Sequence, residues 1–327
     1  MSREVVLASR PEGLPRESDF ELREADEREP GEGEVVVRNV LVSVDPYMRS
    51  RMSGIHTYVP PYAIGDVVDG AAVGRVVASR YDGLAEGDWV HSRLGWRERG
   101  IAPGAELRKL DPSLAPPSTA LGVLGMPGLT AWVGLVDVGR VQEGETLWVS
   151  GAAGAVGSVA AQIAKLKGLR VIGSAGSPEK VAWLESLGIE AFDYNRVPAK
   201  AALADGIDVF FDNVGGRQLE SALFALRDFG RVIACGAISR YNDEGPQPGP
   251  RNLGLIVTKR LRVEGFIVLD HLDRFRAFIE EVGPWVRDGK LACRETIVDG
   301  FERLPSAFAG LFSGDNTGKM LVRVGPD

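Results

Sequence analysis

The stretch VSGAAGAVGSVAAQIAKLKG, residues 149–168, decides how the second half of the chain folds. An apolar run at 146–149 leads into a glycine-rich turn, and a segment with helical periodicity follows the turn. Small residues there let the backbone approach a pyrophosphate closely, and the first N–H groups of the helix then face the anion. We therefore predict a dinucleotide phosphate site on Gly154, Ala155, Val156 and Gly157. The alternative is a tight turn without a ligand, against which the flanking strand and helix argue.

The segments after this turn alternate between strand and helix patterns. Strands are predicted at 170–176, 189–195, 207–216, 230–237 and 261–270, with helices at 177–188, 217–226 and 274–290. Buried parallel strands separated by single helices form a doubly wound sheet. The long polar loop at 239–252 interrupts this pattern, and it is either a lid over a site or a surface excursion.

The first third of the chain has a β pattern instead. Runs rich in β-branched residues at 33–44, 68–79 and 87–96 are separated by glycine and acidic turns, which is typical of a small, bent barrel. The final strand pattern, KMLVRV at 319–324, is expected to return to that barrel. We predict one domain at 1–120 with 295–327 and a second at 121–294.

Composition limits the functional classes. The chain has 327 residues and a net charge of −7, which disfavours nucleic-acid binding. Its first residues, MSREVVLASRPEG, lack the apolar core of a signal peptide, and no apolar run is long enough to span a bilayer. With only two cysteines, a cytoplasmic protein without membrane partners is expected. Three histidines without zinc-motif spacing, and no cysteine in the first 120 residues, predict no metal.

The end of the second predicted strand distinguishes NAD from NADP. An NAD site needs a carboxylate there for the ribose hydroxyls, but the sequence has Ser174, Ser177 and Lys180. Ser177 is a good helix N-cap and Pro178 suits the first helical position, which places Lys180 in the first turn. The helix dipole disfavours a cation there, so we interpret Lys180 as a partner for a 2′-phosphate. The alternative is an exposed lysine without a functional role.

Several motifs in the same order resemble one known family over nearly the whole chain. They are VSVDPYMRSRM (42–52), LGMPGLTAW (124–132), the glycine-rich turn with its helix, GSPEKVAWLESLG (176–188), FFDNVGG (210–216), GRVIACGAISRYN (230–242), EGFIV (264–268) and GDNTGK (314–319). Together they resemble the zinc-independent medium-chain dehydrogenase/reductases, and within them the branch of prostaglandin reductases and alkenal double-bond reductases. A generic nucleotide fold would not supply both DPYMR and GDNTGK.

The resemblance implies an α/β fold with a GroES-like β-barrel catalytic domain and a Rossmann domain, a cleft between them, and a homodimer. It implies NADPH-dependent reduction of a carbon–carbon double bond conjugated to a carbonyl, in an enal or enone substrate. It places these further residues at the cofactor or beside it: Met126, Thr130, Tyr194, Asn213, Cys235, Gly236, Ala237, Ile238, Ser239, Tyr241, Phe266, Ile267, Val268 and Asn316. Cys235, Phe266 to Val268 and Asn316 also have ordinary structural interpretations, as core or turn residues.

Hydride transfer to the β-carbon leaves an enolate, which needs a hydrogen-bond donor and a proton. Some relatives have a tyrosine at the position of Thr258, so this chain lacks a phenol there. Tyr47 and Tyr241 are the candidates, with solvent or the cofactor's ribose hydroxyl as alternatives, and Tyr47 also fits a pocket wall. Quinone reduction and a non-catalytic NADPH-binding redox sensor remain alternative functions for the same fold.

Overall fold

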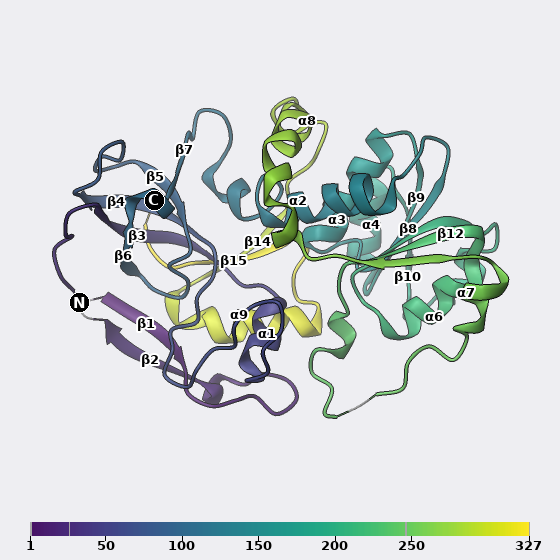
Figure 1. Cartoon of the computed structure of the whole chain (residues 1–327), viewed down its shortest axis with the longest axis horizontal. Helices are drawn as coiled ribbons and strands as arrows, with labels where there is room; N and C mark the ends of the chain where they lie inside the picture. The colour runs from purple at the N-terminus through teal and green to yellow at the C-terminus, as the bar shows by residue number, and fades with distance from the viewer. Residues whose placement is uncertain (1, 26, 246, 327) are drawn as a thin grey trace. The chain divides into compact units, whose positions relative to one another are not determined.

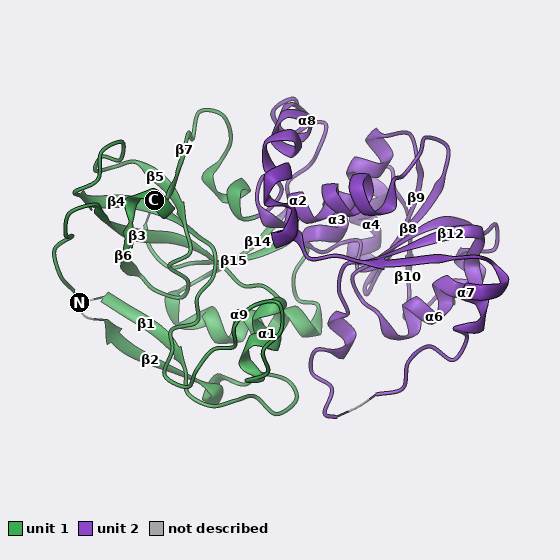
Figure 2. Cartoon of the chain, viewed as in Figure 1, with its two compact units in different colours: residues 1–121, 295–327 green, residues 122–294 purple. Residues whose placement is uncertain are grey.

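Figure 1 shows the computed structural model, which describes residues 2–25, 27–245 and 247–326. The chain forms two compact units, one of Met1–Leu121 with Glu295–Asp327 and one of Gly122–Arg294 (Figure 2). Met1 and Asp327, the ends of the predicted first domain, and Pro246 of the predicted lid lie outside the described residues.

The second unit contains the predicted doubly wound sheet, and this prediction is confirmed. Its six parallel strands lie in the order β10-β9-β8-β11-β12-β13. In chain order they are β8 (Thr146–Val149), β9 (Arg170–Ala175), β10 (Glu190–Asp193), β11 (Ile207–Asp212), β12 (Leu226–Ala234) and β13 (Arg262–Gly265). The helices are α2 (Met126–Val133), α3 (Ala155–Leu166), α4 (Pro178–Ser186), α5 (Ala199–Ala202), α6 (Gly216–Ala225), α7 (Gly254–Thr258) and α8 (Phe275–Arg287).

Alternate side chains of the central strands pack on opposite faces of this sheet. Val209 and Phe211 belong to the cluster formed with α2, α3 and α8, whereas Phe210 belongs to the cluster formed with α5 and α6. Trp148 packs beside Phe210, with ring centroids 4.4 Å apart. The three consecutive apolar residues Val209, Phe210 and Phe211 of β11 are therefore buried on one face or the other, which explains this apolar run in the sequence.

Three predicted strands end at least three residues earlier than expected. The predicted strand 207–216 ends at Asp212, because the N–H groups of Val214 and Gly215 turn back to the Asp212 carboxylate. The predicted strand 230–237 ends at Ala234, because the next two N–H groups turn to the carbonyl of Asp212 at the end of β11. The predicted strand 261–270 is wrong beyond Gly265, where its neighbour β12 also ends and offers no further pairing. Phe266 then packs against the core, and Val268–Arg274 forms a 3₁₀ segment.

The first unit is rich in antiparallel pairing. One sheet joins β1 (Ser2–Leu7) to β2 (Phe20–Ala25), and the larger has the order β14-β15-β3-β4-β5-β7, with β6 (Arg99–Pro103) also paired to β3. The larger sheet contains β3 (Glu34–Ser43), β4 (Ala72–Ser79), β5 (Trp89–Ser92), β7 (Arg108–Leu110), β14 (Glu295–Asp299) and β15 (Lys319–Arg323). As predicted, the final strand returns to this unit, where it pairs antiparallel with β3. Helices α1 (Tyr47–Met52) and α9 (Leu304–Ser313) complete it.

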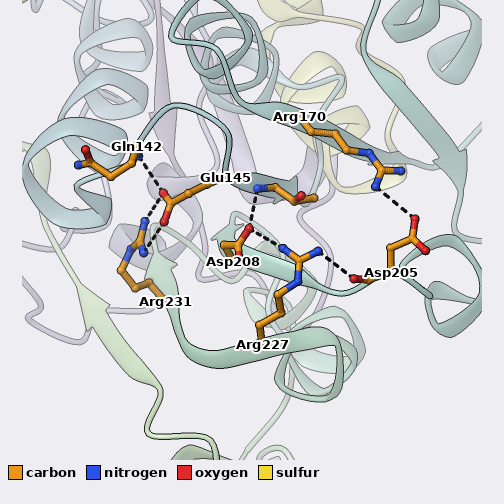
Figure 3. Close-up of polar contacts among 8 residues, drawn as sticks. Gln142, Glu145, Arg170, Asp205, Asp208, Arg227 and Arg231 are labelled. Atoms are coloured by element: carbon orange, nitrogen blue, oxygen red, sulfur yellow. Dashed lines mark hydrogen bonds and ion pairs between the residues drawn. The ribbon is translucent and has the colours of Figure 1, made fainter.

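Ion pairs join strands and loops of the second unit (Figure 3). The Arg231 guanidinium donates to both carboxylate oxygens of Glu145, at 2.9 and 2.6 Å. Asp208 accepts from Arg227 and from the Thr146 N–H at the start of β8. These contacts hold the amino-terminal ends of β8 and β11 in place. The loops described in the next section follow the opposite, carboxyl-terminal ends of the strands.

Among the described residues, no helix has the length and apolar character needed to cross a membrane. Within the same residues, no group of three or more histidine, cysteine or acidic side chains could hold a metal ion.

Candidate functional site

The glycine-rich turn joins β8 to α3 through a tightly packed backbone. A Cβ on Gly157 would lie 2.9 Å from the carbonyl carbon of Gly151 and 3.0 Å from Cα of Ala152, and closer still to the Gly151 oxygen. Gly151 itself has φ +57°, a left-handed conformation that favours glycine. No side chain caps α3 at Gly154, so its first N–H groups remain directed at the turn. These features form a backbone cradle suited to an anion.

In the second loop, after β9, Lys180 lies in the first turn of α4, and its contact with a 2′-phosphate stays a prediction. Ser177 is the N-cap of α4, where its hydroxyl accepts from the Lys180 N–H at 3.4 Å, and Pro178 is the first helical residue. Tyr194, at the end of β10, places its hydroxyl 2.7 Å from the position that a Cβ on Gly176 would take. The structure thus brings Tyr194 beside the loop that leads to α4.

Ser174 has a structural use. Its buried hydroxyl accepts from the Trp148 indole at 3.1 Å and donates to the Gln218 side chain at 2.7 Å. It therefore links β9 to β8 and to α6, and its polar atom is already engaged within the second unit.

Asn213 is held by a buried network at the end of β11. Its side-chain amide donates to the Ser150 carbonyl at 2.7 Å, and its N–H donates to the Ser150 hydroxyl at 2.8 Å. That hydroxyl in turn donates to Asp212, which also accepts the N–H groups of Val214 and Gly215. Asp212 is only 2% exposed, and burial raises the pKa of its carboxyl. One carboxylate thus shapes the turn that carries Asn213.

The segment after β12 folds back onto that turn. The N–H groups of Ile238 and Ser239 donate to carbonyls of Asn213 and Val214, and the Ser239 hydroxyl donates to Val214 at 2.6 Å. The Ala237 N–H donates to the Tyr241 hydroxyl at 3.3 Å. The structure therefore brings most of the predicted residues between Cys235 and Tyr241 against the end of β11.

The Cys235 thiol packs against the apolar core of this unit. Burial, followed by the negative charge of Asp212, raises its pKa to about 12. Burial also raises the pKa of Tyr241. Both groups are therefore protonated near neutral pH, and Cys235 behaves as an apolar packing residue in this environment.

Met126 and Thr130 lie one turn apart on α2, where the Thr130 hydroxyl donates to the Met126 carbonyl at 2.8 Å. Met126 is 42% exposed. Phe266, Ile267 and Val268 follow β13, and the Phe266 ring lies 3.2 Å from the Cβ position of Gly134. All of these residues belong to the second unit.

Tyr47 and Asn316 belong to the first unit. Tyr47 is the first residue of α1, and Asn316 lies in the turn before β15, where its amide donates to the Gly318 carbonyl at 2.7 Å. Thr258 lies exposed on α7, and its hydroxyl is 3.5 Å from the Gly254 carbonyl one turn earlier. The candidate hydrogen-bond donors to the enolate oxygen are therefore still Tyr47 and Tyr241.

Sequence reasoning missed three contributors. Gly151 lies in the same glycine-rich stretch, three residues before the predicted turn, and its spacing could have identified it. Asp212 precedes Asn213 directly, but only the fold reveals that its carboxylate organises the turn. Lys319 closes the GDNTGK motif, and its partner near Tyr47 lies 274 residues earlier in the chain.

Sequence profiles of two families match the chain. One is described as an N-terminal domain of oxidoreductase and matches residues 3–110; the other is described as a zinc-binding dehydrogenase and matches residues 155–283. The two matches fall in the first and second units respectively.

Known proteins are similar over the full length. The NADPH-dependent curcumin reductase of Escherichia coli (strain K12) is 44% identical, over 100% of this chain and 98% of the relative. The 2-alkenal reductase (NADP(+)-dependent) of Nicotiana tabacum is 41% identical, over 99% and 97%. The crystal structure of CurA from Vibrio vulnificus in complex with NADPH has a TM-score of 0.94 and 40% identity, over 99% of this chain and 100% of that chain.

Proposed function

Because this chain belongs to the zinc-independent branch of the medium-chain dehydrogenase/reductases, we propose that it reduces the carbon–carbon double bond of α,β-unsaturated aldehydes and ketones with NADPH. The observation that carries the proposal is the backbone cradle at Gly157, built in a chain whose full-length relatives are named as NADPH- or NADP-dependent reductases. A Cβ on residue 157 would press against the backbone of Gly151 and Ala152 and displace the turn. Glycine avoids this clash, so the residues present fit a bound pyrophosphate.

We assign the cofactor residues from this geometry together with the motifs of the family. The N–H groups at the start of α3, from Gly154 to Gly157, would hold the pyrophosphate. Lys180 in the first turn of α4 and Tyr194 directly after β10 would meet the adenosine 2′-phosphate. Asn213, the segment from Cys235 to Tyr241, Met126, Thr130, Phe266 to Val268 and Asn316 complete the proposed set.

When bound, NADPH supplies the hydride that reaches the β-carbon. The protein must then stabilise negative charge on the carbonyl oxygen and let a proton reach the α-carbon. Burial and the nearby carboxylates of Asp45 and Asp69 raise the pKa of Tyr47 above its ordinary value. The phenol is therefore protonated at neutral pH, and we assign it as the donor to the enolate oxygen.

NADPH oxidation, followed by absorbance, tests the function. The substrates are a 2-alkenal, an enone, a quinone and a primary alcohol with NADP. Reduction of the alkenal or enone supports the proposal. If only the quinone is reduced, the protein is a quinone reductase and the proposed double-bond reduction is wrong. If NADPH binds but no substrate is reduced, a redox sensor is favoured.

The Lys180→Ala variant tests the 2′-phosphate contact in the same assay. We expect the KM for NADPH to rise about tenfold or more, because a charge-assisted hydrogen bond is lost. The KM for NADH should hardly change. Lys200→Ala, on the exposed side of α5, is the matched control. Equal effects on NADPH and NADH would contradict the assignment.

A homodimer is the proposed assembly, formed through the edge strand β13. Arg262 and Glu264 flank Val263 on this strand, so antiparallel pairing of two copies about Val263 would place opposite charges face to face. Light scattering tests the assembly. Val263→Asp should then yield monomers, whereas a monomeric wild-type protein would refute it. The two cysteines form no disulfide in the described part of the chain, which fits the cytoplasmic location that we propose.

A further inference from the structure

A buried ion pair lies two residues from the proposed donor. Lys319, the first residue of β15, is 4% exposed, and its ammonium donates to the Val44 carbonyl at 2.9 Å and to the Asp45 carboxylate at 2.8 Å. The second oxygen of that carboxylate accepts from the Ser43 hydroxyl. Both oxygens of Asp45 are therefore engaged by groups other than Tyr47.

The Tyr47 hydroxyl itself has no such engagement. Among the residues that the structure describes, none donates to it or accepts from it. It lies 3.9 Å from the position that a Cβ on Gly70 would take, which places it beside the Asp69–Gly70 segment. The phenol is half-buried, and its proton is not donated to any protein group that the structure describes.

A second carboxylate near this hydroxyl is held in the same manner. The Arg51 guanidinium pairs with Asp69, and the Tyr62 hydroxyl donates to the Asp69 carbonyl at 3.0 Å. Arg51 also lies over the Tyr62 ring, 4.0 Å from its centroid. The charged groups that act on Tyr47 are Asp45, Asp69, Arg93 and Arg51, and both carboxylates among them have a cationic partner.

This arrangement has a chemical consequence. A carboxylate without a partner is a stronger acceptor than a neutral carbonyl, and it would compete with the substrate for the phenol proton. We propose that Lys319 is a positioning residue for the reduction: by holding the Asp45 carboxylate, its ammonium leaves the Tyr47 hydroxyl as a donor for the carbonyl oxygen of the substrate. The inference rests on the proposed function, and it gives the lysine of GDNTGK a role distinct from cofactor contact.

A purely structural role for Lys319 would be to fasten β15 to the end of β3. The two roles differ in what happens when the carboxylate is also removed. If Lys319 acts by restraining Asp45, then D45N should recover activity lost in K319M. If Lys319 only fastens the strand, the second substitution should recover nothing.

The experiment compares K319M, D45N/K319M, K319R and Y47F with the wild type in steady-state reduction of a 2-alkenal. We expect K319M to lower kcat about tenfold, at unchanged KM for NADPH, because an interaction with the developing enolate is weakened. D45N/K319M should recover to within about threefold of the wild type, and K319R should retain most activity because it keeps the charge. K109M, which breaks the exposed Lys109–Asp88 pair in the same unit, is the matched control.

Thermal unfolding and NADPH binding are measured for every variant. If K319M does not fold, K319Q replaces it, alone and with D45N, since an amide can still donate to the Val44 carbonyl. Wild-type kcat in K319M, loss that D45N does not recover, or full kcat in Y47F overturns this inference while the reductase function stands. A wild-type protein that reduces no alkenal or enone overturns both.

Discussion

Replacement of Gly157 by alanine tests whether the cradle is set by backbone packing. The new Cβ would lie 2.9 Å from the Gly151 carbonyl carbon and 3.0 Å from the Ala152 Cα. Both neighbours are backbone atoms, so neither can rotate away. Overpacking usually costs about 1–3 kcal/mol, and against backbone atoms that cannot move aside the cost lies at the upper end, about 2–3 kcal/mol. The higher helix propensity of alanine offsets about 1 kcal/mol of it.

We therefore expect Gly157→Ala to destabilise the protein by about 1–2 kcal/mol, which lowers Tm by about 2–8 °C for a domain of this size. The displaced turn should also weaken NADPH binding about tenfold or more, because the N–H groups no longer converge on one anion. Thermal unfolding by circular dichroism and a fluorescence titration with NADPH measure the two effects.

Gly254→Ala is the matched control in the same unit. Gly254 is the first residue of α7, where a Cβ would meet no atom within 4 Å. No overpacking opposes the helix propensity of alanine there, so the variant should be unchanged in stability or stabilised by up to about 1 kcal/mol, with unchanged NADPH affinity. The reasoning fails if Gly157→Ala is as stable as the wild type, or if both variants change in the same direction.

Three further predictions concern other parts of the molecule. A maleimide at pH 7.5 should label the exposed Cys293 and spare Cys235, whose pKa burial raises to about 12; rapid labelling of both thiols would contradict this. Arg231→Met should destabilise the protein by about 1–3 kcal/mol in urea unfolding, because Glu145 loses a bidentate partner while largely buried; an unchanged midpoint would contradict it. Burial and the nearby arginines lower the pKa of His91 to about 4 from 6.5, so the unfolded state takes up its proton first as pH falls, and stability should drop between these values by up to about 3 kcal/mol. His91→Gln should flatten this pH dependence, and an equally steep profile would refute the assignment.

The sheet of the second unit could be predicted because its signals are local. Each strand is a short apolar run, each helix begins near a recognisable turn, and Ser177 with Pro178 marks the start of α4 by residue type alone. The strand predicted over 261–270 was wrong beyond Gly265 for a reason outside that segment. It ends where β12 ends, and a single run of residues does not contain the length of its neighbour.

The residues of the candidate site also divide into those with local sequence signals and those whose role depends on distant partners. The phosphate turn and Lys180 were predicted from residue types in one or two loops, and their contacts with the cofactor stay predictions. Asp212 could not be assigned, because its role depends on three donors from two strand ends, Ser150, Val214 and Gly215. A carboxylate at a strand end resembles any other in the sequence until the fold supplies those donors.

The lysine of GDNTGK illustrates the physical reason most clearly. Its neighbours in sequence suggest a turn and the start of a strand, and both are present, yet neither requires a cation at Lys319. The requirement comes from the antiparallel pairing of β15 with β3, which brings the ammonium to Val44 and Asp45 at the start of the segment that carries Tyr47. Burying a lone lysine would cost several kcal/mol, so its position is explained only by the carboxylate that it meets. Because that carboxylate stands two residues from the phenol, the two motifs DPYMR and GDNTGK act as one electrostatic unit although they lie at opposite ends of the chain.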